Sequence, residues 1–253
     1  MCSSDLEIVA RAAPDGHTLL IVSASIAVNP GLVKRLPYDT ARDFAPVGMV
    51  ANGPYLMVIH PGVPAKTVNE FITWARAQNG KVDFASTGAG GPPHLAAELL
   101  KVTAGIPMQH VPYKGGGPAL VDLLGGQVQL HFNVPINLIA HVKGGRLKAI
   151  GITGASRLHA LPDMPTFTEA GFNNFDVSYW QGILAPAGTP KPIVGHLSAE
   201  IAKILAMPDV RERLISQGAE PFISSSEQFA AMIKTESAKY AKVIKAANIK
   251  IDQ

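Results

Sequence analysis

The chain has 253 residues, of which 47% are hydrophobic and only 16% are charged, so it can form one large domain or two ordinary ones around a sizeable core. The formal net charge of +3 is mild and the basic residues are scattered, which argues against a nucleic-acid-binding protein, because such proteins usually gather basic residues on one face. No apolar run reaches the roughly 18–20 residues of a membrane span, and the single cysteine, Cys2, excludes an internal disulfide.

The N-terminal residues point to a sequence that starts inside a longer protein. Cys2-Ser3-Ser4-Asp5-Leu6 is the peptide that one reading frame of a common sequencing adapter encodes. Residues 1–11 lack the basic and the long apolar segments of a signal peptide. We therefore expect Met1 to about Leu6 to be an assembly artefact, and the true N-terminus, with an export signal, to be missing.

Short apolar segments alternate with helical patterns and Gly/Pro turns, which is typical of an α/β fold. We predict strands at residues 17–23, 44–50, 55–59, 82–86, 108–111, 128–132, 148–153 and 179–185. We predict helices at 67–79, 92–102, 118–124, 135–142, 166–170, from 190 onwards, at 210–217 and from 225 onwards. Two of these helix starts carry capping boxes, in which Thr67 is followed by Glu70 and Ser225 by Gln228.

The clearest chemical feature is a glycine-rich loop between a predicted strand and a predicted helix. Unpaired N–H groups at a helix start bind anions, and glycines allow a ligand to approach the backbone closely. A turn that only packs the helix on the sheet explains the same residues equally well. The dinucleotide-binding pattern fails because Pro93 replaces the third glycine, and no Gly-Lys-Ser/Thr sequence forms a P-loop. The candidate ligand-binding residues of this loop are Ser86, Thr87, Gly88, Gly90, Gly91 and His94.

A second glycine-rich loop follows the next predicted strand. Tyr113, Lys114 and Gly115 stand before a short predicted helix, and we count them as candidate ligand-binding residues. A lysine in this position is more often a solvated residue at the rim of a site than a ligand contact. Asn133 is a further candidate, because it comes one residue after another predicted strand.

The remaining candidates lie after the first predicted strand. Ser23, Ser25 and Asn29 occupy the segment beyond its carboxyl end, where ligands bind in open α/β sheets. For Asn29 a turn or capping role is an equally good explanation.

Catalytic patterns are poor throughout the sequence. None of the 8 histidines has the spacing of a metal site, and no G-x-S-x-G nucleophile motif occurs. The candidate loops are neutral and rich in hydrogen-bond donors, which suits reversible binding of an anion. We therefore expect no catalytic residues, no metal, no cofactor and no enzymatic activity.

A series of short motifs resembles the extracytoplasmic solute receptors of tripartite tricarboxylate transporters, known as the Bug family. The resemblance runs from about Glu7 to Ile251. In chain order it rests on Ala13-Pro14-Asp15-Gly16-His17-Thr18-Leu19-Leu20, Asn29-Pro30, Leu36-Pro37-Tyr38-Asp39, Asp43-Phe44-Ala45-Pro46-Val47, His110-Val111-Pro112-Tyr113-Lys114-Gly115, Asp122-Leu123-Leu124-Gly125-Gly126, Leu161-Pro162-Asp163-Met164-Pro165 and Leu184-Ala185-Pro186-Ala187-Gly188-Thr189-Pro190.

The resemblance implies a type 2 periplasmic binding-protein fold, with two α/β lobes joined by two crossing strands. By resemblance the crossings lie near residues 55–59 and 181–185, lobe 1 comprises residues 7–56 and 182–253, and lobe 2 comprises 57–181. The first strands of lobe 1 would then be missing. The family grips carboxylates with backbone N–H groups, hydroxyls and waters. The chain departs from the family pattern at Gly91-Pro92, where Gly-Ser is common, and at Asn133, where Asp is frequent.

The resemblance also implies the function and the partners. The chain would be a periplasmic receptor that captures a small carboxylated solute and delivers it to membrane permease subunits. We expect a monomer that is not membrane-embedded and binds no nucleic acid. Two alternatives use a similar fold: a subunit that presents its ligand to a membrane sensor kinase, and the effector domain of a transcription regulator.

Overall fold

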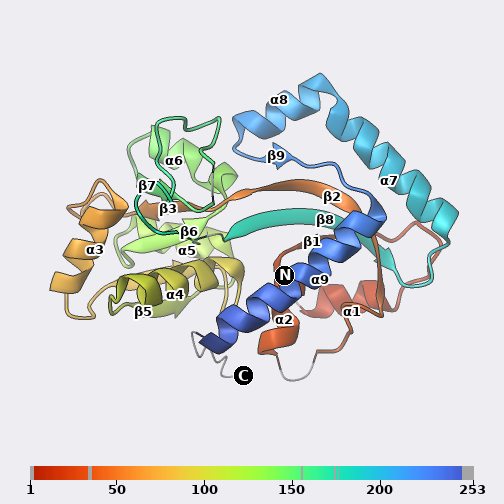
Figure 1. Cartoon of the computed structure of the whole chain (residues 1–253), viewed down its shortest axis with the longest axis horizontal. Helices are drawn as coiled ribbons and strands as arrows, with labels where there is room; N and C mark the ends of the chain where they lie inside the picture. The colour runs from red at the N-terminus through yellow and green to blue at the C-terminus, as the bar shows by residue number, and fades with distance from the viewer. Residues whose placement is uncertain (1–2, 34–35, 155, 174, 176, 247–253) are drawn as a thin grey trace. The chain divides into compact units, whose positions relative to one another are not determined.

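The computed structural model describes residues 3–33, 36–154, 156–173, 175 and 177–246 (Figure 1). Met1 and Cys2, the first residues of the expected N-terminal artefact, lie outside this range. The chain divides into two compact units. The first unit is Met1–Asn52, Trp180–Ile215 and Glu220–Gln253, and the second unit is Gly53–Tyr179 with Ser216–Ala219.

The first unit contains a four-stranded sheet with the order β1-β8-β2-β9. Its strands are β1 (Leu20–Ser23), β2 (Phe44–Pro54), β8 (Ser178–Pro186) and β9 (Glu220–Pro221). β1 runs antiparallel to β8, with Leu20 opposite Leu184, and β2 runs antiparallel to β9. Its helices are α1 (Ser3–Ala10), α2 (Ser25–Leu32), α7 (Lys191–Ala206), α8 (Pro208–Ser216) and α9 (Ser226–Ala246).

Helix α9 packs closely on other parts of the first unit. It lies against α2 (Figure 1), and a Cβ added to Gly31 of α2 would lie 3.0 Å from Ile244. Phe229 of α9 stands edge-on to Trp180 of β8, with ring centroids 5.6 Å apart. Gly182 allows this packing, because any side chain at that position would overlap the Phe229 ring.

The second unit contains a five-stranded sheet with the order β5-β4-β6-β3-β7. Its strands are β3 (Leu56–Ile59), β4 (Asp83–Ser86), β5 (Gln109–Pro112), β6 (Leu130–Asn133) and β7 (Lys148–Ile152). β4 is parallel to both β5 and β6, whereas β3 is antiparallel to β6 and β7. Its helices are α3 (Val68–Ala77), α4 (Pro92–Ala104), α5 (Gly116–Leu124), the 3-10 turn η1 (Pro135–Asn137) and α6 (Ile139–Lys143).

Helices cover both faces of the second sheet, as the alternation of side chains along each strand requires. Phe84 packs in a core cluster with residues of α3 and α4, such as Phe71 and Leu100. The next residue, Ala85, points to the opposite face and packs in a cluster with Leu123 of α5. Both faces of the sheet thus pack against a hydrophobic cluster, although its strands also carry polar side chains.

Both capping boxes mark real helix starts. The Ser225 hydroxyl accepts the Gln228 N–H at 3.2 Å, and the Gln228 side chain accepts the Ser225 N–H at 2.8 Å, so the reciprocal pair predicted for α9 is confirmed. At α3 the Thr67 hydroxyl accepts the Glu70 N–H at 3.2 Å. The Glu70 carboxylate, however, accepts the N–H of Lys66 at 2.8 Å, one residue before the expected donor.

The predictions of secondary structure need five corrections. The strand predicted at 17–23 is confined to Leu20–Ser23, and the strand predicted at 44–50 continues through Asn52-Gly53 to Pro54. The helix predicted at 135–142 is divided into η1 and α6. The helix predicted at 166–170 is wrong, because Thr166 bridges to Ile152 and the residues after it form turns. The segment 25–29, expected to be a loop, belongs to α2, where Pro30 and Gly31 obscure the helical pattern.

Across the described ranges, no helix combines the length and the apolar character that crossing a membrane would need.

Candidate ligand-binding site

Three parallel strands of the second unit end at the same edge of the sheet. In the strand register Ser86 lies opposite Pro112, and Ala85 lies opposite His131. The segments that follow β4, β5 and β6 therefore meet. A Cβ added to Gly116 would lie 3.1 Å from Asn133 Nδ2 and 3.8 Å from Thr87 Cγ2. We call this group, residues 87–91, 113–117 and Asn133, the strand-end site.

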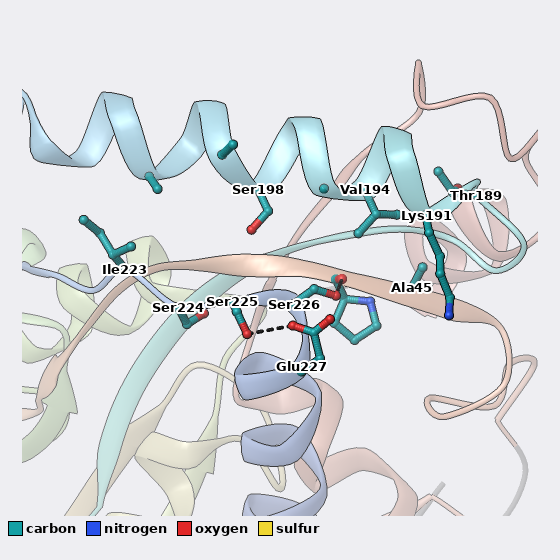
Figure 2. Close-up of a pocket in the computed structure, with 14 residues that line it drawn as sticks. Ala45, Thr189, Lys191, Val194, Ser198, Ile223, Ser224, Ser225, Ser226 and Glu227 are labelled. Carbon is teal, nitrogen blue, oxygen red and sulfur yellow. Dashed lines mark hydrogen bonds between the residues drawn. The ribbon is translucent and has the colours of Figure 1, made fainter.

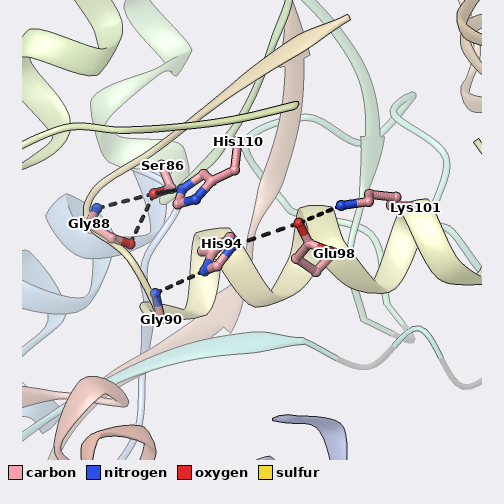
Figure 3. Close-up of polar contacts among 7 residues, drawn as sticks. All are labelled: Ser86, Gly88, Gly90, His94, Glu98, Lys101 and His110. Carbon is pink, nitrogen blue, oxygen red and sulfur yellow. Dashed lines mark hydrogen bonds and ion pairs between the residues drawn. The ribbon is translucent and has the colours of Figure 1, made fainter. Parts of the chain in front are cut away.

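The Ser86 side chain makes hydrogen bonds with the backbone of the first loop of this site (Figure 3). Its side chain is fully buried, and its hydroxyl donates to the Gly88 carbonyl at 2.9 Å and accepts the Gly88 N–H at 3.2 Å. The same oxygen lies 2.7 Å from His110 Nε2. With the Ser86 hydroxyl hydrogen assigned to the Gly88 carbonyl, His110 Nε2 is the donor in this contact. The predicted donation from Ser86 to a ligand is therefore replaced by bonds within the loop.

His94, the other candidate side chain of the loop, is also engaged internally. Its Nδ1 accepts the Gly90 N–H at 2.8 Å, so the ring carries its hydrogen on Nε2. Nε2 faces Glu98 Oε1 at 3.7 Å, and Lys101 Nζ contacts the same oxygen at 3.0 Å. Burial on its own would raise the pKa of Glu98, but the hydrogen bonds from His94 and Lys101 hold this pKa below its ordinary value.

The two histidine rings and a core phenylalanine form one stack. His94 and His110 have ring centroids 3.7 Å apart, and the centroid of Phe84 lies 5.0 Å from that of His110. Burial, with a contribution from the neighbouring His94, lowers the pKa of His110 to about 4. His110 is consequently neutral at physiological pH, in the tautomer that donates from Nε2.

The first loop keeps a small set of backbone donors free. Gly88, Gly90 and Gly91 use their N–H groups within the loop, the last of them to the Gly88 carbonyl at 3.3 Å. Helix α4 offers less than expected at its start, because Pro92 and Pro93 have no N–H. Among the described residues, the N–H groups of Thr87 and Ala89 and the Thr87 hydroxyl have no hydrogen-bond partner. Three donors, from the two residues on either side of Gly88, thus remain for a ligand.

The second loop adds donors from the start of α5. Gly115 caps this helix with a φ of 106°, which a residue with a side chain rarely adopts. The helix begins at Gly116, two residues before the predicted start, so the N–H groups of Gly116 and Gly117 lie in its first turn and have no helical acceptor. The predicted ligand-binding residues include Gly115 but not Gly116 and Gly117. Three consecutive glycines before Pro118 could have indicated that all three belong to the loop and the helix start.

The tyrosine and the lysine of the second loop differ in their surroundings. The Tyr113 hydroxyl donates to the Asp122 carboxylate at 2.6 Å, and burial together with that carboxylate raises the pKa of Tyr113 to about 12. Its hydroxyl hydrogen is therefore used within the second unit. Lys114 is exposed, as expected for a residue at the rim of a site.

Asn133 is buried at the end of β6 and held in one orientation. Its Oδ1 accepts the Val134 N–H at 2.8 Å and lies 3.4 Å from Asn137 Nδ2, while its Nδ2 lies 3.0 Å from His131 Nε2. His131 Nδ1 lies 2.9 Å from the Ala85 carbonyl, to which it donates, so Nε2 accepts from Asn133. Burial lowers the pKa of His131 to about 4. Asn137 is not among the predicted site residues. It lies four residues after Asn133, within the segment predicted to be a helix, so its place near Asn133 could have been inferred.

Ser23, Ser25 and Asn29 belong to the first unit, whereas the strand-end site belongs to the second. The Ser23 hydroxyl lies 3.3 Å from that of Ser25, and Asn29 Nδ2 donates to the Tyr38 hydroxyl at 3.0 Å. The pKa of Tyr38 is raised by burial. Asn29 thus has a side-chain partner within the first unit, and this contact is neither a turn nor a helix cap.

The first unit also contains a cavity of about 720 Å³ between α7, β2 and the start of α9 (Figure 2). Its hydroxyl groups are largely used by the fold: Ser224 accepts the Met49 N–H at 3.0 Å, and Ser226 donates to the Pro46 carbonyl at 2.6 Å. None of the candidate residues lines it. Within the described ranges, no three His, Cys, Asp or Glu side chains gather as a metal site would require.

Comparison with known proteins places this geometry in a family. Residues 5–249 match the profile described as "Tripartite tricarboxylate transporter family receptor" (TctC). BugT of Bordetella pertussis is 34% identical over 96% of this chain and 75% of its own length. An R. palustris protein solved with adipate has a TM-score of 0.94 and 31% identity, covering 98% of this chain and 83% of that one.

A second solved structure agrees with the first. MatC from Rhodopseudomonas palustris, with bound malate, has a TM-score of 0.87 and 31% identity, covering 96% of this chain and 84% of that one. The mixed α/β fold with two sheets is that of periplasmic binding proteins, as expected from the sequence. The chain therefore belongs to the tripartite tricarboxylate transporter receptors, the Bug family of solute-binding proteins, and the resemblance found in its motifs is confirmed.

Proposed function

We propose that this chain binds a small carboxylated solute in the periplasm and delivers it to the permease subunits of a tripartite transporter. The observation that carries this proposal is the set of neutral donors at the strand-end site. Thr87 and Ala89 from one loop and Gly116 and Gly117 from the next offer free N–H groups where three parallel strands end.

These donors match the chemistry of a carboxylate. An ionised carboxylate only accepts hydrogen bonds, and N–H groups at the start of a helix favour an anion. Two arginines of the second unit are engaged elsewhere: Arg76 donates to the Ala104 carbonyl at 2.6 Å, and Arg157 pairs with Glu169 at 3.1 Å. Binding through neutral donors avoids a tight ion pair, which suits a receptor that must release its ligand.

The two units would serve as the lobes of the receptor. The proposed lobes, residues 7–56 with 182–253 and residues 57–181, follow from the family resemblance. In this proposal Ser23 and Ser25 are ligand-binding residues of the first lobe, and the carboxylate donors belong to the strand-end site, which lies wholly in the second unit. The related R. palustris proteins contain adipate and malate, so dicarboxylates of about this size are the first ligands to test.

Calorimetry with matched acids and amides tests the binding step. We expect heat of binding from adipate or malate and none from adipamide or malamide, which have the same length without the charge. Binding of the amides as tightly as the acids would overturn the carboxylate assignment. Delivery is tested separately: deletion of the gene should abolish uptake of the labelled acid by cells that retain the permease, and unchanged uptake would refute a transport role.

A further inference from the structure

We propose that His94 and His110 are positioning residues that hold the loop of residues 86–91 in the conformation that binds ligand, each through a different ring nitrogen. His94 acts on Gly90 through Nδ1, and His110 acts on Ser86 through Nε2. This inference rests on the proposed carboxylate-binding function and assigns a role at the same site to two residues that do not touch the ligand.

The loop needs such support because of its backbone. Gly88 has a φ of 142° and Gly90 a φ of 77°, both in the region that favours glycine. Glycine has more conformational freedom to lose than any other residue, so a loop built on it is held only by the bonds made to it. The bonds that fix its two ends run from Gly88 to Ser86, which His110 supports, and from Gly90 to His94. Thr87 and Ala89, the residues with free N–H groups, flank Gly88 between these two anchors.

The histidines are themselves fixed by their neighbours. Their rings stack on each other, and Phe84 of β4 stacks on His110. The titratable and charged groups around the pair are Glu98 and Lys101 of α4, which bond to each other at 3.0 Å. Glu98 also faces His94 Nε2, which keeps that ring turned with Nδ1 towards Gly90. The stack therefore connects the core of the second unit with the backbone of the loop (Figure 3).

Crossed amide substitutions separate positioning from packing. The side-chain oxygen of Asn can stand in for His Nδ1 as an acceptor, and the side-chain nitrogen of Gln can stand in for His Nε2 as a donor. His94→Asn should therefore keep the bond to Gly90, and His94→Gln should lose it. At the other position the order reverses: His110→Gln should keep the bond to Ser86, and His110→Asn should lose it.

The four variants are compared in the 253-residue chain by two measurements. The first is amide hydrogen exchange at Gly88 and Gly90 without ligand, and the second is adipate affinity by calorimetry. We expect His94→Gln and His110→Asn to speed exchange and to weaken adipate binding by about five- to tenfold, the effect of one lost hydrogen bond. The retaining variants should stay within about threefold of the original protein.

The crossed pattern decides the outcome. If both substitutions at a position have equal effects on exchange, or if neither has any, the positioning role is wrong, whatever the melting temperatures. Exchange is measured without ligand, so a crossed exchange pattern in a protein that binds no carboxylate would support the loop anchors and refute the proposed function instead. A variant that unfolds is recognised by fast exchange throughout α4. In that case the two substitutions at the other histidine position test the positioning role.

Discussion

The imidazole rings of His94 and His110 lie face to face, with centroids 3.7 Å apart and 12° between their planes. Burial lowers the pKa of His110 to about 4, and repulsion by the neighbouring His94 adds to this effect. The loop of residues 86–91 is thus bonded to two stacked rings, and each ring makes its hydrogen bond through a different nitrogen.

Mild acid should destabilise the second unit through its buried histidines. Burial lowers the pKa of His131 from 6.5 to about 4, and burial with His94 does the same for His110. Because the folded-state pKa is the lower one, the unfolded chain takes up protons first, and stability is lost as pH falls from 6.5 towards 4. For the fully buried His131 this loss is up to about 1.4 kcal/mol per pH unit. Urea unfolding at about pH 7, 6 and 5 measures it, and an unfolding free energy that stays constant would contradict it.

Gly116→Ala should weaken ligand binding more than it affects folding. The new Cβ would lie 3.1 Å from Asn133 Nδ2 and 3.8 Å from Thr87 Cγ2, inside the strand-end site. Gly195→Ala is the control, because it also adds a Cβ within a helix, meets nothing within 4 Å and lies outside the strand-end site. Calorimetry with adipate should separate the two variants. Equal affinities would show that the ligand does not approach Gly116.

Gly182→Ala should destabilise the first unit. The added Cβ would overlap the Phe229 ring, with Cε1 at 2.7 Å, and neither the strand nor the ring can move without loss of packing. Overpacking of this kind costs about 1–3 kcal/mol. Gly195→Ala in α7 has open space and should be neutral or stabilising by about 0.5–1 kcal/mol, since Ala is the better helix former. Urea unfolding of both variants checks this, and a neutral Gly182→Ala would mean that Phe229 packs elsewhere.

Removal of the cap at α9 should have a measurable cost. Ser225→Ala eliminates the acceptor of the Gln228 N–H, and we expect a loss of about 0.5–2 kcal/mol of unfolding free energy. Ser225→Asp, which keeps an acceptor at the N-cap, should recover most of the loss. If both variants unfold alike, the cap does not contribute to stability.

Much of the fold could be predicted from the sequence, because apolar runs, glycines, prolines and capping residues mark where most strands and helices begin and end. The strand-loop-helix around Ser86 was visible from its apolar run, its glycines and the proline that starts α4. Helix α2 was missed because Pro30 and Gly31 lie inside it. The helix predicted at 166–170 failed because pairing of Thr166 with Ile152 overrides a local helical preference.

The roles of the polar side chains were harder to predict. Ser86 was taken for a ligand donor because its partner, His110, is 24 residues away and reaches it only through the parallel register of β4 and β5. Asn133 is oriented by His131, two residues earlier on the same face of β6, and His131 is in turn held by the Ala85 carbonyl of the neighbouring strand. Sequence indicated where the site lies, whereas the division between groups that face a ligand and groups that hold the loop depends on contacts across strands.

The most direct test of the account is an NMR titration of the amide N–H signals with adipate and malate. The account predicts that the largest shifts fall on Thr87, Ala89, Gly116 and Gly117, the free donors of the strand-end site. A carboxylate that binds but leaves these four signals unchanged, and instead shifts those of Ser198 and Ser226 around the cavity of the first unit, would contradict it.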